Sequence, residues 1–277
     1  MRIMVAHSPD SDDAFMFHAL VNGKVETGGY RFENVLSDIE TLNRRALEGA
    51  YEVTAISYHA YAQLHHRYAL LTTGSSMGED YGPIVVSRPG ALKGGGPAGK
   101  RIAIPGLMTS AYLALRLYQP DFQPEVVPFD RILEAVRTGT VDAGLVIHEG
   151  QLTFAEEGLE LVVDLGKWWR KETGLPLPLG GNAIRRDLGP ERMREIGRVL
   201  KESIAYGLAH REEALDHAQS YGRGLDRQKV DRFVGMYVNA RTVDCGPDGR
   251  EAVRLFLARG HAAGIIAEAV VPDWVEC

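Results

Sequence analysis

The sequence predicts an α/β protein of two lobes that face each other across a ligand cleft, with two crossings of the chain between the lobes. The main observation is a repeat: residues 2–57 and residues 101–148 both read as strand, helix, strand, helix, strand. A second observation is the Gly/Pro-rich stretch 88–100 between the two units, which is typical of a boundary or a surface loop. Two similar units in one chain favour two lobes over one continuous sheet.

The two units match element by element. The first consists of the strand RIMVAHS, the helix DDAFMFHAL, the strand YRFENVL, the helix DIETLNRRALEG and the strand EVTAIS. The second consists of RIAIPG, TSAYLALRLY, PEVVPF, DRILEAVRTG and DAGLVIH in the same order. In both, a helix that ends at a glycine, Gly49 or Gly139, leads through an acidic residue into an apolar strand. Because ligands bind beyond the carboxyl ends of parallel strands, we expect the functional site in the cleft between the units.

The last third of the chain is expected to be helical. The stretch 191–218 carries apolar side chains at helical spacing, and Pro247 at a first-turn position opens the last long helix. No strand of the second unit remains for these helices to cover, so we expect them to pack on the first unit. The chain then forms a discontinuous large lobe, 1–88 plus 184–277, and a small lobe, 89–183. The two crossings between the lobes make a hinge that can close over a ligand.

Composition narrows the function classes. The formal net charge of −6, spread over both halves, leaves no basic face for nucleic acid and no polybasic patch for a membrane surface. No apolar run approaches the roughly 20 residues of a membrane-spanning helix, and no secretory signal precedes the first strand. The two cysteines, Cys245 and Cys277, show no metal-ligand spacing. We therefore expect a cytoplasmic protein in a reducing compartment; the sequence indicates no oligomeric state.

A polar loop follows the first strand and opens the first helix. Ser8, Asp10, Ser11 and Asp12 are all residues that cap helix N-termini, so capping alone could account for one or two of them. Four such residues exceed what a cap requires, and they stand at a strand's carboxyl end. We expect Ser8, Asp10 and Asp12 to line the cleft. A metal site is the weaker alternative, because no spaced His or Glu completes it.

The equivalent helix of the second unit begins with Thr109 and Ser110. Free backbone N–H groups and the positive end of the helix dipole favour an anion there, and the hydroxyls add donors. The plain alternative is an N-cap, which needs only one of the two hydroxyls. The sequence therefore predicts that a ligand carboxylate or phosphate binds here.

The third strands of the two units end in Ser57 and His148. Histidine titrates near neutral pH and can act as a general acid or base, although a single histidine is more often structural. The repeat places His148 at the same cleft as Ser57, which favours catalysis or ligand contact. The adjacent pair His65-His66 lacks a third metal ligand at suitable spacing, which favours a solvated face.

Roles for three other residues stay open. The pair Trp168-Trp169 could form an aromatic wall for a ligand or pack in the core, and Asn182 could bond backbone or ligand.

Three motifs, SPDSDDAFMF, GLMTSAYLAL and GLVIHEGQLTF, together resemble those of the 1,4-dihydroxy-6-naphthoate synthase family of the futalosine route to menaquinone. The resemblance covers essentially the whole chain. It implies the two-lobed fold of type II periplasmic binding proteins. It also implies a lyase-type conversion of cyclic dehypoxanthinyl futalosine to 1,4-dihydroxy-6-naphthoate, with no metal and no organic cofactor.

The resemblance also implies roles for particular residues. His148 is the implied proton acceptor, Ala55-Ile56-Ser57 and Thr109-Ser110 are implied to hold a substrate that bears a carboxylate, and the SPDSDD loop is an additional contact. Three alternatives remain: a small-carboxylate binding protein or solute receptor of the same fold, the chorismate-dehydrating enzyme of the same pathway, and a ligand-sensing regulatory domain. The last is disfavoured because no DNA-binding helix pair is appended.

Overall fold

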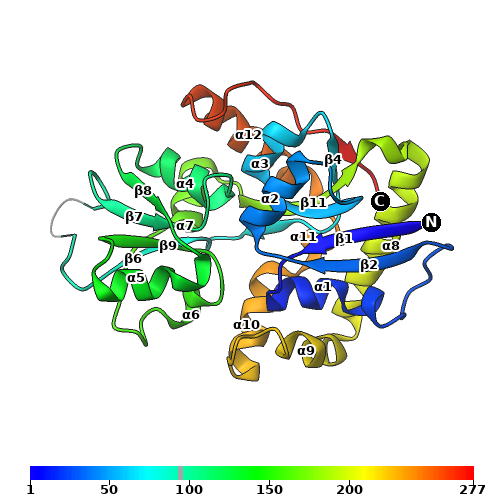
Figure 1. The fold of residues 1–277 in the computed structure, drawn as a ribbon, viewed down its shortest axis with the longest axis horizontal. Coiled ribbons are helices and arrows are strands. Elements are labelled where there is room, and N and C mark those ends of the chain that lie inside the picture. The colour runs from blue at the N-terminus through cyan, green and yellow to red at the C-terminus, as the bar shows by residue number, and fades with distance from the viewer. Residues whose placement is uncertain (93–95) are drawn as a thin grey trace.

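The computed structural model describes residues 1–92 and 96–277, and its strands form two sheets in two lobes (Figure 1). The first sheet contains, in spatial order, β12 (Trp274–Val275), β4 (Tyr68–Leu71), β11 (Leu177–Arg185), β3 (Val53–Ser57), β1 (Arg2–His7) and β2 (Arg31–Leu36), with β5 (Ser76–Gly78) beside β11. The second contains β10 (Glu160–Asp164), β6 (Ile84–Ser87), β9 (Ala143–Val146), β7 (Arg101–Ile104) and β8 (Gln123–Val126). The predicted two-lobed α/β fold is confirmed.

The predicted repeat is present in both sheets. In the first, helices α1 (Ser11–Val21) and α2 (Ile39–Leu47) connect β1, β2 and β3; in the second, α4 (Ser110–Tyr118) and α5 (Ile132–Thr138, after the 3₁₀ turn η1 at Phe129–Arg131) connect β7, β8 and β9. The opening strand of each unit pairs in parallel with both other strands of its unit. At the predicted helix ends, Gly49 and Gly139 have φ of 70° and 82°, a conformation that favours glycine.

Each sheet is completed by one antiparallel strand that belongs to neither repeat. Strand β11 pairs with β3, and β6 pairs with β9. The chain therefore changes sheet between Gly78 and Ile84 and returns between Asp164 and Leu177. Both changes come earlier than the lobe boundaries expected at 88/89 and 183/184; within the stretch 88–100, residues 93–95 lie outside the described residues. The division into lobes at 88/89 and 183/184 stays a prediction.

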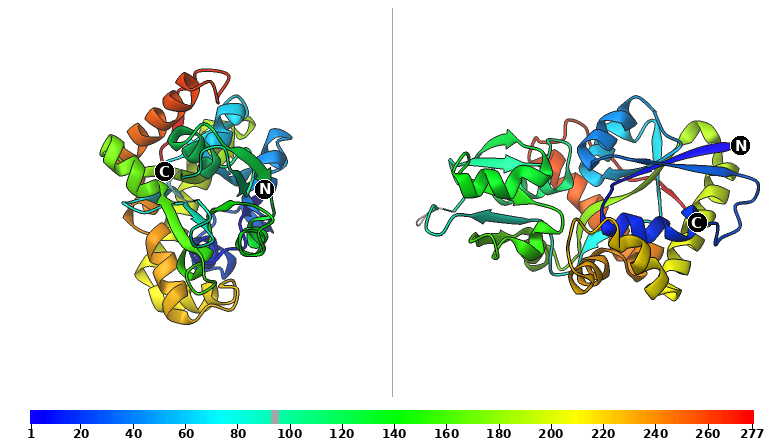
Figure 2. Two further views of the ribbon diagram at one scale, coloured as in Figure 1. Left: turned by 90° about the vertical axis from the view of Figure 1, so that its left-hand side faces the viewer. Right: turned by 60° about the horizontal axis from the view of Figure 1, so that its bottom comes forward.

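The C-terminal helices pack on the first sheet, as the sequence predicts. Helices α8 (Pro190–Ala209), α9 (Arg211–Gln219) and α10 (Arg227–Tyr237) all contact α1. Figure 2 shows these helices, in yellow and orange, on one side of the large sheet. Helices α3 (Tyr58–Leu64) and α12 (Gly246–Ala262) contact each other and cover the opposite face. The short elements η2 (Arg186–Leu188), α6 (Gly150–Thr153), α7 (Leu165–Thr173) and α11 (Ala240–Val243) complete the chain.

The core follows from the alternation of side chains along the strands. In β4, Tyr68 and Leu70 join the apolar cluster with α3 and α12, while Ala69 and Leu71 join the cluster with α1 and α8. The first of these clusters continues through α4 and α7, where it includes Trp169, into the small sheet, where it includes Ile102. The two lobes thus share one apolar cluster.

Candidate active-site cleft

A cleft with an empty volume of about 830 Å³, which includes space open to solvent, lies between the two sheets. All eight residues that the sequence analysis assigns to substrate binding line it: Ser8, Asp10, Asp12, Ala55, Ile56, Ser57, Thr109 and Ser110. They come from the carboxyl ends of β1 and β3 and from the first turn of α4. The placement agrees with the rule for parallel strands; contact with a substrate stays a prediction.

The acidic loop does more than cap α1. Asp10 occupies the N-cap position without a side-chain capping bond; instead its carboxylate accepts from the hydroxyl of Ser8 at 3.0 Å and pairs with Arg223 at 2.5 Å. Burial and the nearby Glu149 raise the pKa of Asp10 to about 6. Burial and the neighbouring carboxylates raise the pKa of Asp12 as well. The loop therefore presents to the cleft carboxyl groups that hold protons more readily than ordinary aspartates.

The raised pKa of Asp10 predicts that Asp10→Asn stabilises the fold in a pH-dependent way. The folded-state pKa of Asp10 lies above its ordinary value of 3.8, so the ionised carboxylate costs stability once the pH rises through about 6. The variant should melt a few degrees above the unmodified protein at pH 8, and the difference should vanish near pH 4. Melting curves across this range measure it. An equal shift at all pH values would show that the effect is not ionisation.

The start of α4 carries hydrogen-bond donors suited to an anion. Thr109 is the N-cap: its Oγ1 accepts from the N–H of Tyr112 at 3.2 Å and donates to the carbonyl of Gly106 at 2.9 Å. Its hydroxyl is thus used for capping, as in the plain alternative. Ser110 Oγ accepts from the N–H of His59 at 3.2 Å and keeps its proton for another acceptor. The first-turn N–H groups of Ser110 and Ala111 have no partner within the helix, and both residues line the cleft.

Asn43, a residue that the sequence analysis did not identify, holds Ser57. Its Nδ2 donates to Ser57 Oγ at 3.1 Å and its Oδ1 accepts from Ser57 N–H at 2.9 Å, and both residues are buried. The amphipathic pattern of α2 marks Asn43 only as a polar residue in a helix. Residue spacing in the sequence does not show that Asn43 contacts the end of β3.

The paired bonds predict that Asn43→Ala lowers the free energy of unfolding by about 1–3 kcal/mol, because two buried groups of Ser57 lose their partners. The variant should also bind ligand more weakly, since Ser57 is no longer oriented. Urea unfolding and substrate kinetics measure the two effects. Asn22→Ala is the control: that amide bonds the carbonyl of His18 at the far end of α1, so its loss should leave the kinetics unchanged.

His148 lies just outside the cleft lining. Its Nε2 donates to the carbonyl of Phe129 at 2.9 Å, and its Nδ1 accepts from the N–H of Gly150 at 3.0 Å. Its flanking residues Ile147 and Gln151 do line the cleft. Burial lowers the pKa of His148 below 6.5, so the imidazole is neutral at pH 7. It is in the protonation state that a base requires, but with both nitrogens occupied.

Two side-chain amides in the cleft lining lack a partner for their nitrogen in residues 1–92 and 96–277. Gln151, on α6, accepts the hydroxyl of Tyr237 at 2.9 Å on its Oε1, which leaves Nε2 as a free donor. Asn182, in the middle of β11, is 1% exposed. Unpartnered buried donors that face a cleft are suited to oxygen atoms of a ligand. For Asn182 the sequence leaves a bond to backbone or to ligand open, and no sequence pattern indicates a role for Gln151 or Tyr237.

The tryptophans do not line the cleft. Trp169 is fully buried, donates from Nε1 to the carbonyl of Pro176 at 3.0 Å and packs against Phe256. Trp168 contacts the ring of Tyr118 edge-on. Of the two roles left open, packing is the one that the structure supports.

No helix in the described part of the chain is long and apolar enough to cross a membrane.

Two lobes with a cleft between them define a class of ligand-binding folds, and solved structures agree with that class. The alkanesulfonate-binding protein from Xanthomonas axonopodis pv. citri, bound to MOPS, matches with a TM-score of 0.72 at 12% identity, covering 100% of this chain and 98% of that one. A likeness at this identity concerns the fold alone. The two-lobed fold of periplasmic binding proteins is thereby confirmed.

The family follows from closer matches. A family model described as menaquinone biosynthesis matches residues 3–262. A 1,4-dihydroxy-6-naphthoate synthase from Thermus thermophilus is 45% identical over 99% of both chains, and one from Streptomyces coelicolor is 34% identical over 98% of this chain and 96% of its own. A crystal structure of a protein from Archaeoglobus fulgidus has a TM-score of 0.91 at 49% identity, covering 96% of this chain and 98% of that one. The chain belongs to the menaquinone biosynthesis family.

Proposed function

We propose that this protein converts cyclic dehypoxanthinyl futalosine to 1,4-dihydroxy-6-naphthoate, as the names of its relatives suggest. The observation that carries the proposal is full-length identity of 45% with a synthase of that name. The cleft supports it, because it combines an anion site at the start of α4 with several neutral donors and a nearby histidine. These are the groups that a substrate with a ring carboxylate and sugar hydroxyls requires.

In this proposal, different groups in the cleft bind the carboxylate and the hydroxyls of the substrate. The first-turn N–H groups of α4 and the Ser110 hydroxyl bind the carboxylate. Ser57, held by Asn43, and the carboxyl groups of Asp10 and Asp12 bind sugar hydroxyls. Protonated carboxyl groups can donate as well as accept, and the raised pKa values of this loop favour that form.

His148 acts as the general base that starts ring opening and elimination, and aromatisation of the product draws the reaction forward. Its acceptor atom Nδ1 is engaged by the Gly150 N–H, so this bond must open before a substrate proton can be accepted. Gly150 is the first residue of α6, which is held to the large lobe by Gln151–Tyr237 and by a bond from Ser11 Oγ to Glu149 at 3.0 Å. Displacement of α6 on substrate binding would free the imidazole, and closure of the lobes would exclude water.

Two finer assignments belong to the same proposal. The activity is of lyase type and uses no metal or organic cofactor in the cleft. The protein acts in the cytoplasm, which is supported by its two free cysteines, Cys245 and Cys277.

Chromatography of product formed from cyclic dehypoxanthinyl futalosine by purified, chelator-treated protein tests the proposal. Appearance of dihydroxynaphthoate supports a cofactor-free synthase. Loss of chorismate instead would identify the chorismate-dehydrating activity of the same pathway. Tight binding of a small carboxylate without turnover of either substrate would overturn the enzyme proposal and favour a binding protein.

A further inference from the structure

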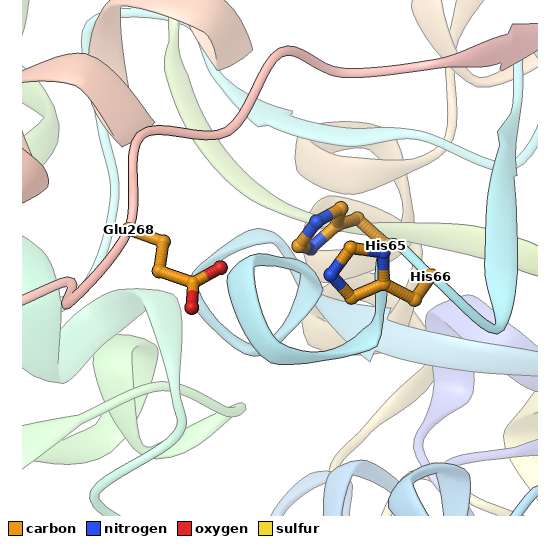
Figure 3. Close-up of side chains that lie close together, drawn as sticks. All are labelled: His65, His66 and Glu268. Atoms are coloured by element: carbon orange, nitrogen blue, oxygen red, sulfur yellow. The ribbon is translucent and has the colours of Figure 1, made fainter.

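A cluster of metal-ligand side chains lies outside the cleft. His65, His66 and Glu268 place one ligand atom each within 4.8 Å of the others (Figure 3). None of the three lines the cleft between the lobes. They line instead a separate hollow with an empty volume of about 710 Å³, together with Gln63. We infer that these residues form a binding site for one divalent transition-metal ion, of the zinc, nickel or cobalt type.

The third ligand comes from a distant part of the chain. His65 and His66 stand at the end of α3, and Glu268 lies in the segment that follows α12. That segment is fixed against α3 at its far end, where the Asp273 N–H donates to the hydroxyl of Tyr61 at 3.1 Å. Figure 3 shows the Glu268 carboxylate directed toward the two imidazoles. The sequence shows no third ligand at suitable spacing and therefore favours a solvated face for His65-His66; the returning segment brings Glu268 close to both.

The surroundings of His65 suit a metal ligand. Its Nδ1 donates to the carbonyl of Ala62 at 3.1 Å, which fixes the tautomer and leaves the Nε2 lone pair for a cation. Ligating histidines commonly donate their other nitrogen to a carbonyl or carboxylate in this way. In the described ranges, His66 and Glu268 enter no hydrogen bond or ion pair through their side chains, so metal binding breaks no such bond; the existing contact of His66 is with the His65 ring, at 3.7 Å between ring centroids.

The donor set selects the metal class. Two imidazole nitrogens and one carboxylate oxygen suit zinc, nickel or cobalt, and hard cations such as calcium or magnesium prefer oxygen ligands alone. Water or the side-chain oxygen of Gln63 can complete the coordination. A bound ion would link α3 to the segment between α12 and β12. Because no ligand touches the cleft, the ion should stabilise the fold and leave turnover unchanged.

Zinc titration of the full-length, chelator-treated protein by calorimetry tests the inference. We expect one equivalent to bind, and the melting temperature to rise by about 5 °C at a free zinc concentration well above Kd. His66→Ala and Glu268→Gln should each weaken zinc binding at least about tenfold. His210→Ala removes another exposed histidine and should bind zinc as the unmodified protein does. Cobalt(II) absorption in the visible range reports whether nitrogen ligands are engaged.

Some results of these experiments would overturn the metal site. No binding at millimolar zinc, or binding that survives both His66→Ala and Glu268→Gln, would overturn the site. Both altered residues are exposed, so the variants should fold normally. A change in turnover of the unmodified protein on zinc loading would contradict the separation from the cleft. Because the site is independent of the proposed reaction, its result stands whether or not dihydroxynaphthoate is formed.

Discussion

Replacement of His148 by alanine is expected to lower kcat by about 10²–10⁴-fold, the usual contribution of a general base. The protein should remain folded, although loss of the bonds to Phe129 and Gly150 leaves two backbone groups unpaired. Single-turnover kinetics on the purified variant measure the chemical step apart from binding. Partial recovery of turnover with added imidazole would show that the missing ring acts on a proton rather than only packing against its neighbours.

The pH profile distinguishes a base from a packing residue. Burial lowers the pKa of His148 below 6.5, so the neutral form persists through neutral pH. Activity should therefore be retained at alkaline pH and fall as the pH drops through that lowered pKa. In His148→Ala this acidic limb should be absent from the residual activity. Asp10, with a pKa of about 6, could produce a similar limb. If the limb disappears in Asp10→Asn instead, it belongs to the loop and not to the histidine.

A His148→Ala variant with near-normal turnover would remove the histidine from the reaction. Gly150→Ala provides a second probe that keeps the imidazole. A Cβ at Gly150 would stand 2.9 Å from the His148 ring, so the ring must shift. We expect reduced kcat with little change in KM, because the substitution lies behind the cleft lining.

The strand–helix repeat in the sequence predicts both the fold and the position of the cleft. Two strand–helix repeats specify two sheets, and the ends of their strands specify where polar residues such as Ser57 and Thr109 meet. Residue spacing in the sequence does not specify where a side chain points once its strand has ended. Strand β9 ends at Val146, two residues before His148, and the chain turns there into α6. The imidazole consequently faces the backbone of Phe129 rather than the cleft.

The sequence does not predict the other site residues because each contacts a partner that is distant in the chain. Asn43 supports Ser57 from a neighbouring helix, Tyr237 fixes Gln151 from the opposite lobe, and Glu268 approaches His65 from the C-terminal segment. None of these pairs has a local signature. Sheet membership shows the same limit, because β6 pairs with β9 and β11 pairs with β3, and both partners are distant in the chain. Local patterns show where each strand is, but not which sheet it joins.

Asn182→Ala is expected to lower kcat/KM about 10–100-fold while leaving the melting temperature unchanged or slightly higher. The amide nitrogen of Asn182 is buried without a partner among the described residues, so the ligand-free protein bears its desolvation cost. A hydrogen bond to a charged ligand oxygen is worth about 1.5–3 kcal/mol, which corresponds to this loss of kcat/KM. Steady-state kinetics and thermal melting of the same preparation measure both quantities.

A structural amide should respond in the opposite way, which gives a matched control. Gln219 Nε2 donates to the carbonyl of Leu225 at 2.7 Å, and neither residue lines the cleft, so Gln219→Ala should lose stability and keep its kinetics. If Asn182→Ala instead loses stability with unchanged kcat/KM, the amide supports β11 and does not bind substrate. An unpaired buried donor destabilises the ligand-free protein. At a cleft wall, a ligand oxygen that accepts its hydrogen bond removes this desolvation cost.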